Sequence, residues 1–185
     1  MVQCSVYIAV SLDGYIARED GDINWLHNPL YTTDDAGDFG YSAFIAGIDT
    51  LVMGRNTFEK VLSFGEWPYG TLPVVVLSTR HISLPHHLTD RVRVLDCVPE
   101  SLVAKLQSEG IQHIYVDGGQ TIQRFVKASL INDITLTFIP ILLGKGIPLF
   151  GSLEIEVPLL LKNSQAFSNG FVQSTYEVIA NPEIL

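Results

Sequence analysis

The stretch Asp117-Gly118-Gly119-Gln120-Thr121 joins two segments of opposite character, and this junction decides the fold. The run before it, residues 111–116, is short, apolar and rich in β-branched residues, which predicts a buried strand. After it, apolar residues recur at the i, i+3, i+4 and i+8 positions of an amphipathic helix: Ile122, Phe125, Val126 and Leu130. The sequence therefore predicts a strand, a two-glycine turn and a helix over 121–130.

A strand, two glycines and a helix start together form a potential anion site. The N-terminus of a helix presents unpaired N–H groups and a partial positive charge, and glycines let a phosphate approach the backbone. The alternative is a tight strand-to-helix turn with no ligand. The motif by itself leaves both interpretations open.

Composition limits the class of protein. The chain has 185 residues, 47% hydrophobic and 17% charged, so a single compact domain over residues 1–185 is expected. A net charge of −9 argues against nucleic acid or an anionic membrane surface as a partner. Cys4 and Cys97 are too few for a disulfide framework and lack metal-ligand spacing. With no signal-type N-terminus and no apolar run approaching about 18 residues, we expect a cytoplasmic, bacterial-type protein.

Strand and helix patterns alternate through the first two thirds of the chain. Strands are predicted over 2–10, 50–54, 72–77, 92–95 and 111–116, and helices over 41–48, 55–62 and 99–110. Asp34 or Asp35 could cap the first helix. A polar, irregular segment from about 15 to 35 comes before that helix, and loops of such length are usually functional or mobile.

The last third contains strands alone, over 133–139, 153–161 and 171–179. This order predicts an α/β fold with a mainly parallel sheet, helices on its faces and an antiparallel C-terminal edge. Such sheets bind ligands beyond the carboxyl ends of their strands. Three strand-to-helix junctions could converge on one ligand: Gly54-Arg55, Ser78-Thr79-Arg80 and Asp117-Gly118-Gly119.

Five segments in this order resemble the dihydrofolate reductase superfamily, and most nearly the reductase domain of riboflavin biosynthesis with its stand-alone bacterial relatives. They are Ala9 to Ala17, Met53 to Glu59, Val76 to Arg80, Val116 to Gly119 and Pro140 to Phe150. The last is typical of the riboflavin-type branch, and the similarity runs from Val2 to about Ile179. The resemblance implies a dihydrofolate reductase-like three-layer α/β/α fold, NADPH as cofactor and hydride transfer to a heterocycle.

The same resemblance implies which residues contact NADPH: Ala9, Gly54, Arg55, Thr57, Ser78, Thr79, Arg80, Asp117, Gly118, Gly119, Gln120 and Thr121. Arg55 carries a permanent fork of donors suited to a phosphate, although it could instead pair with Glu59, four residues on. The segment 78–80 could equally be a solvated loop. A cis peptide bond between Gly118 and Gly119 is also implied.

Asp38 and Asp13 are the candidate catalytic acids. Asp38 lies on the apolar stripe of the first helix, so a partly desolvated carboxyl with a raised pKa is expected, and its spacing from Gly54 fits the substrate-binding acid of dihydrofolate reductases. The alternative is an aspartate favoured by the helix dipole. Asp13 could instead stabilise the turn at Gly14. Trp25 resembles the loop tryptophan that contacts substrate near the nicotinamide, or it simply packs.

Other chemistries lack their motifs. The five histidines show no metal-ligand spacing, so no metal is expected, and the His-x-Glu and Pro-Cys-x-x-Cys signature of zinc deaminases does not occur. We therefore expect an NADPH-dependent reductase of a pteridine-like or aminopyrimidine substrate, of the 5-amino-6-(5-phosphoribosylamino)uracil reductase type. The alternatives are dihydrofolate reduction itself and a non-catalytic nucleotide-binding module on the same fold. No obvious basic pair for a ribose phosphate or a folate glutamate is visible.

The C-terminal strands also bear on assembly. Apolar residues are dense there, at 159–161, Phe167, Phe171 and Val172, and no helix is predicted to cover that edge. Proteins often resolve an uncovered edge by pairing with a second copy, and the riboflavin-type reductases are dimers. We expect a homodimer formed mainly by the C-terminal strands. The alternative is that these residues fill the core of one protomer.

Overall fold

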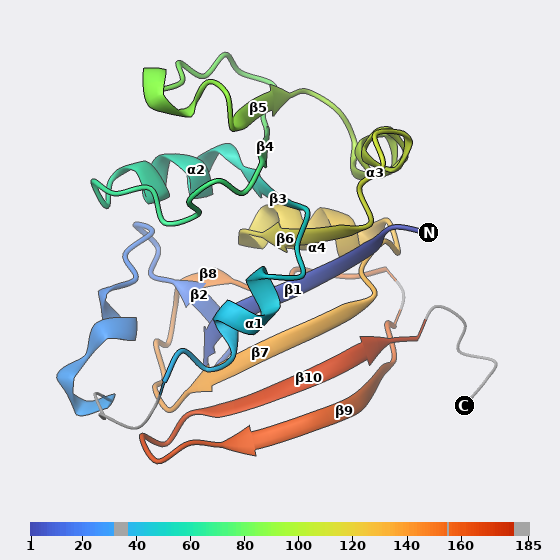
Figure 1. Cartoon of the computed structure of the whole chain (residues 1–185). Helices are drawn as coiled ribbons and strands as arrows, with labels where there is room; N and C mark the ends of the chain where they lie inside the picture. Colours follow the sequence, from blue (N-terminus) through green and yellow to red (C-terminus); the bar gives the residue numbers. More distant parts are fainter. Residues whose placement is uncertain (32–36, 155, 180–185) are drawn as a thin grey trace.

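The computed structural model describes residues 1–31, 37–154 and 156–179, and an eight-stranded sheet runs through them (Figure 1). Its order is β5-β4-β3-β6-β1-β7-β10-β9. The strands are β1 Gln3–Ser11, β3 Thr50–Gly54, β4 Val74–Leu77, β5 Val92–Leu95, β6 His113–Asp117, β7 Asp133–Ile139, β9 Leu159–Ala166 and β10 Val172–Val178. The neighbours from β5 to β7 are parallel, and β10 and β9 pair antiparallel. The predicted mixed sheet is confirmed.

Helices cover both faces of the sheet. They are α1 Tyr41–Ile45, α2 Arg55–Leu62, α3 Pro99–Ser108 and α4 Gly119–Lys127, with 3-10 turns η1 Asn24–His27, η2 Pro29–Tyr31 and η3 His86–Leu88. On one face, Phe58 of α2 packs with Val74 and Val76 of β4, and α1 packs against the same cluster. On the other face, α3 and α4 pack with Val75. Alternate residues of each strand point to opposite faces, so both sides must be covered by apolar helix stripes, which produces the three layers.

The boundaries of several elements differ from the predictions. Helix α4 begins at Gly119, two residues early, and ends at Lys127. The strand predicted over 153–161 exists with other bounds, since β9 covers Leu159–Ala166 and overlaps the prediction only at 159–161. All residues of β9 are exposed. Its second half, residues 162–166, therefore lacks the alternation of apolar and polar residues by which a half-buried strand is told from a loop. The short strands β2 Tyr15–Ala17 and β8 Ile147–Pro148, which pair with each other, were not predicted, because so few residues show no alternation of apolar and polar side chains. The suggested caps Asp34 and Asp35 lie outside the described residues.

The topology creates one crevice. Strands β1, β3, β4 and β6 are parallel, so their carboxyl ends meet at the same edge of the sheet. From β3 the chain moves outward to β4 through α2, whereas from β6 it moves through α4 past β1 to β7. The connections therefore leave β3 and β6 in opposite directions, and a ligand site is expected between them. Among the described residues, no helix is long and apolar enough to span a bilayer.

Candidate active site

A cavity of about 1010 Å³ opens at the carboxyl ends of β1, β3, β4 and β6. All the residues predicted to contact the cofactor line it: Ala9, Gly54, Arg55, Thr57, Ser78, Thr79, Arg80, Asp117, Gly118, Gly119, Gln120 and Thr121. They come from four strand ends and the first turns of α2 and α4. The fold thus brings the three junctions into one cleft.

The two-glycine turn is required by close packing. Gly118 has φ 87° and ψ 132°, and a Cβ atom there would overlap Oγ1 of Thr57 in α2. A Cβ on Gly119 would lie 2.9 Å from Cδ1 of Ile16 and 3.3 Å from the carbonyl oxygen of Pro148. The start of α4 is therefore wedged between α2 and the β2–β8 pair. No cis peptide bond occurs among the described residues, so that prediction is wrong, and the positive φ of Gly118 makes the turn instead.

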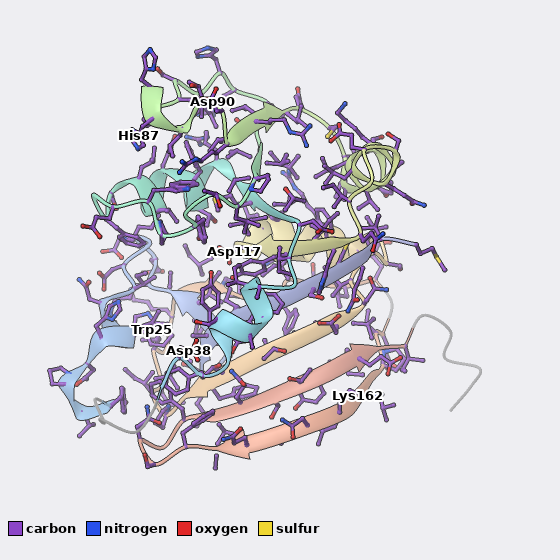
Figure 2. All side chains as sticks on the ribbon, viewed as in Figure 1. Trp25, Asp38, His87, Asp90, Asp117 and Lys162 are labelled. Carbon is purple, nitrogen blue, oxygen red and sulfur yellow. The ribbon has the colours of Figure 1, made fainter. Side chains whose placement is uncertain are left out.

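Asp117 is a carboxyl group that lines the cleft, and it lies near the middle of the molecule (Figure 2). It ends β6, between β3 and β1, and burial raises its pKa to about 6, partly offset by the N–H of Gly118. Burial of the two tyrosines, and after it the charge of Asp117, raises the pKa of Tyr41 to about 12 and also raises that of Tyr69. The sequence placed Asp117 with the cofactor contacts. Burial at the end of a central strand is what gives this acid a near-neutral pKa, and sequence reasoning missed that property.

Basic side chains gather on the α2 and α4 side of the cleft. Arg55 donates through Nη1 to both carboxylate oxygens of Glu59, at 2.9 and 3.2 Å, so the alternative ion pair is present. Lys60, Arg80 and Arg124 also line the cleft and form no ion pair within the described part of the chain. Arg124 was not predicted. Its position one helical turn after Gln120 was the available signal.

The segment after β4 is a shaped turn and not a free loop. The hydroxyl of Ser78 donates to the carbonyl oxygen of Arg80 at 2.8 Å and accepts from the backbone N–H of Arg80 at 3.0 Å. The Ser78 side chain therefore fixes the turn, which presents Thr79 and Arg80 at the cleft wall.

Asp38 does not lie where the sequence predicted. It is exposed before α1, below Asp117 in the view of Figure 2, and does not line the cleft. Its carboxylate accepts from the backbone N–H groups of Gly40 at 3.0 Å and Ser42 at 2.7 Å. Hydrogen bonds from Ser42 and Gly40 lower its pKa, opposite to the predicted rise. The helix-start interpretation of Asp38 fits the structure, and a core-facing acid at this position is wrong.

Asp13 also contacts the chain instead of the cleft. One carboxylate oxygen accepts from Ser11 Oγ at 2.6 Å and from Leu143 N at 3.1 Å, and the other accepts from Gly144 N at 2.7 Å. These bonds lower its pKa. Asp13 ties the end of β1 to the loop before β8, 130 residues away, which is a wider role than the local turn that the sequence suggested.

Trp25 is a core residue of η1. It is 4% exposed and clusters with Ile139 and Phe171, while its neighbours Ile23 and Leu26 line the cleft. Its Nε1 has no hydrogen-bond partner among the described residues. Trp25 therefore packs beneath the residues that line the cleft and does not line it itself, as the packing alternative predicted.

Comparisons with known proteins agree with this geometry. The family model described as the RibD C-terminal domain matches residues 4–173. Uncharacterized protein YwjB of Bacillus subtilis is 37% identical over 165 residues, which is 88% of this chain and 90% of YwjB. A structure named as a putative riboflavin biosynthesis protein from Shewanella sp. PV-4 has a TM-score of 0.90 and 40% identity over 96% of this chain and 99% of that one.

A more distant structure shows the fold alone. The diaminohydroxyphosphoribosylaminopyrimidine deaminase/5-amino-6-(5-phosphoribosylamino)uracil reductase of Thermotoga maritima has a TM-score of 0.72 at 16% identity, over 96% of this chain and 57% of that protein. The sheet order, the cleft at its strand ends and the matched family model lead to one conclusion. The chain belongs to the RibD C-terminal domain family, a riboflavin-type reductase domain with a dihydrofolate reductase-like fold.

Proposed function

We propose that the protein is an NADPH-dependent reductase that transfers hydride to an aminopyrimidine or pteridine-like substrate, as the 5-amino-6-(5-phosphoribosylamino)uracil reductases do to the sugar carbon of theirs. One observation carries the proposal: every residue predicted for the cofactor lines a single cleft at the switch point of the sheet. Family membership supports it. A reaction that uses NADPH in this way is expected in the cytoplasm.

The residues of the cleft fit a nicotinamide dinucleotide phosphate. The positive-φ turn at Gly118 and the start of α4 would hold the pyrophosphate, since α4 has nine residues and no side chain caps its first N–H groups. Arg55 and Arg80 would hold the 2′-phosphate, and Ala9 at the end of β1 would lie beside the nicotinamide. When bound, NADPH supplies the hydride. The protein supplies position and charge.

Asp117 is our candidate for the proton donor. Reduction of a C=N bond requires a proton as well as a hydride, and a carboxyl with a pKa of about 6 retains its proton in a useful fraction of molecules near neutral pH. It lines the cleft at the end of β6, which lies between β3 and β1 in the sheet. Asp38 and Asp13, with lowered pKa values and occupied oxygens, are poor donors.

A turnover assay separates the enzyme from the binding module. NADPH oxidation is measured at 340 nm against a panel of aminopyrimidines, pteridines and dihydrofolate, together with NADPH binding by calorimetry. Turnover of an aminopyrimidine or pteridine, falling as the pH rises above about 6, supports the proposal. Binding without turnover of any compound favours the module, and turnover of dihydrofolate alone favours dihydrofolate reduction.

Arg55→Ala is expected to weaken NADPH by roughly 10- to 100-fold and NADH much less, because only NADPH carries the 2′-phosphate that a charge-assisted hydrogen bond would hold. Glu59→Gln is the matched control. It removes the ion pair but leaves the guanidinium, so NADPH should bind at least as tightly as to the wild type. Calorimetric titration of both cofactors measures this. Equal losses for NADPH and NADH in Arg55→Ala would contradict the 2′-phosphate role.

We also propose that the protein is a homodimer paired through β9. Phe171 is buried within the protomer, as the core-filling alternative expected, but the leucines of β9 are exposed, and Leu161 is 54% exposed. Strand β9 is the outer strand of the sheet, at the lower edge in Figure 1. Leu161→Glu should convert a dimer to a monomer in light scattering at micromolar concentration. Leu142→Glu, at a leucine elsewhere that is even more exposed (71%), should leave the dimer intact. A monomeric wild type would contradict the proposal.

A further inference from the structure

The cationic side chains that line the cleft all lie in one of its two halves. Arg55, Lys60, Arg80 and Arg124 lie on α2, after β4 and on α4, where the cofactor is proposed to bind. The other half is formed by β1, β2 and the segment leading to η1. It contributes apolar side chains and the carboxylates Glu19 and Asp20. This second half is the space left for a substrate beside the nicotinamide.

No free cation serves the substrate half. The chain has 11 Lys and Arg residues, all within the described ranges, so each can be placed. Two of them lie beside this half without lining the cleft: Arg18 pairs with Asp22 at 3.7 Å, and Lys145 pairs with Glu19 at 3.0 Å. His27 in η1 is exposed and does not line the cleft either.

Backbone donors can replace cations in binding a phosphate, but two pairs of them, which lie outside the lining of the cleft, are already occupied. The carboxylate of Asp13 accepts from Leu143 N and Gly144 N, and the carboxylate of Asp38 accepts from Gly40 N and Ser42 N. Paired N–H groups of this kind are the usual anion sites of loops and helix starts. Here the chain's own carboxylates fill them, so these N–H groups are not available to a phosphate.

From this arrangement we infer that the substrate carries no phosphate and no carboxylate: it is an uncharged or cationic heterocycle, the dephosphorylated counterpart of a phosphoribosyl aminopyrimidine. The inference rests on the proposed function and narrows its substrate class. A phosphate in the substrate half would gain no free cationic partner, and it would face the carboxylates of Asp20 and of Glu19, which already holds Lys145. The same reasoning excludes the glutamate tail of a folate.

The first test uses ribose 5-phosphate as the probe, titrated by calorimetry into the protein saturated with NADPH. We expect no saturable binding, because the cationic half is then filled. Saturable binding would overturn the inference. The titration is repeated without NADPH. Any binding of ribose 5-phosphate should then be lost in the double variant Arg80→Ala/Arg124→Ala, and it should be unchanged in the single variants Lys145→Ala and Arg18→Ala. Loss of binding in either of the last two variants would also overturn it.

The titration of ribose 5-phosphate without NADPH makes failure of the proposed function distinguishable from failure of the inference about the substrate. If NADPH fails to bind, the proposed function fails, while the variants still locate phosphate binding in one half or the other. A second arm compares a ribosylated aminopyrimidine with and without its 5′-phosphate. We expect kcat/KM to be at least about tenfold higher without the phosphate, the size of effect that an unpaired charged group produces. An equal or higher value with the phosphate contradicts the inference, and if neither is turned over the phosphate titrations decide.

Discussion

Gly118→Ala is expected to destabilise the protein by roughly 2–5 kcal/mol, or to prevent folding. Two costs combine at this position. The φ of 87° is unfavourable for any residue with a Cβ, and that Cβ would overlap Oγ1 of Thr57 across the α2–α4 contact. Urea unfolding measures the change in the free energy of unfolding.

Gly110→Ala is the matched control for this prediction. Gly110 has nearly the same φ, 89°, but a Cβ there meets nothing within 4 Å, so only the backbone cost of about 1–2 kcal/mol is expected. Thr57→Ala in the Gly118→Ala background removes the overlapping atom and should recover part of the loss, which also keeps the test usable if the single variant does not fold. Equal losses in Gly118→Ala and Gly110→Ala would show that the wedge between α2 and α4 does not constrain the turn.

Asp117→Asn is expected to stabilise the protein increasingly as the pH rises from 4 to 6, by about 1–3 kcal/mol in all. The folded-state pKa is about 6 and the ordinary value is 3.8, so in this window the folded protein holds a proton that the unfolded chain has lost. Wild-type stability contributed by this proton is therefore present below pH 4 and lost as the pH rises through 6. The asparagine has no charge to bury, so the difference between the two proteins grows and then becomes constant.

Urea unfolding of both proteins at pH 4, 5, 6, 7 and 8 measures this difference. Asp49→Asn is the control of opposite sign. Hydrogen bonds from Gln112 N and His113 N lower the pKa of Asp49, so its contribution is present above the ordinary pKa and lost as the pH falls. Asp49→Asn should therefore be less stable than wild type at neutral pH. A wild-type to Asp117→Asn difference that does not change with pH would mean that the Asp117 carboxylate is fully hydrated in the cleft.

The sequence alone determined the layers and the position of the cleft. Apolar runs such as 74–76 and 114–116 predict central strands because strands buried on both faces must be apolar throughout. The junctions at Gly54, Ser78 and Asp117 end those strands, and parallel strands present their carboxyl ends at one edge, so local pattern sufficed to predict that the junctions meet.

Only the tertiary structure decided what the acids do. Asp13 binds N–H groups of a loop 130 residues away, and Asp38 binds its own helix start, so neither oxygen pair is free for a substrate. Asp117 acquires its near-neutral pKa from burial between distant strands. Helical periodicity predicts which face of a segment is apolar. It cannot predict which backbone donors a carboxylate will find, because those donors come from elements that are remote in sequence, and hydrogen bonding and desolvation there set its pKa.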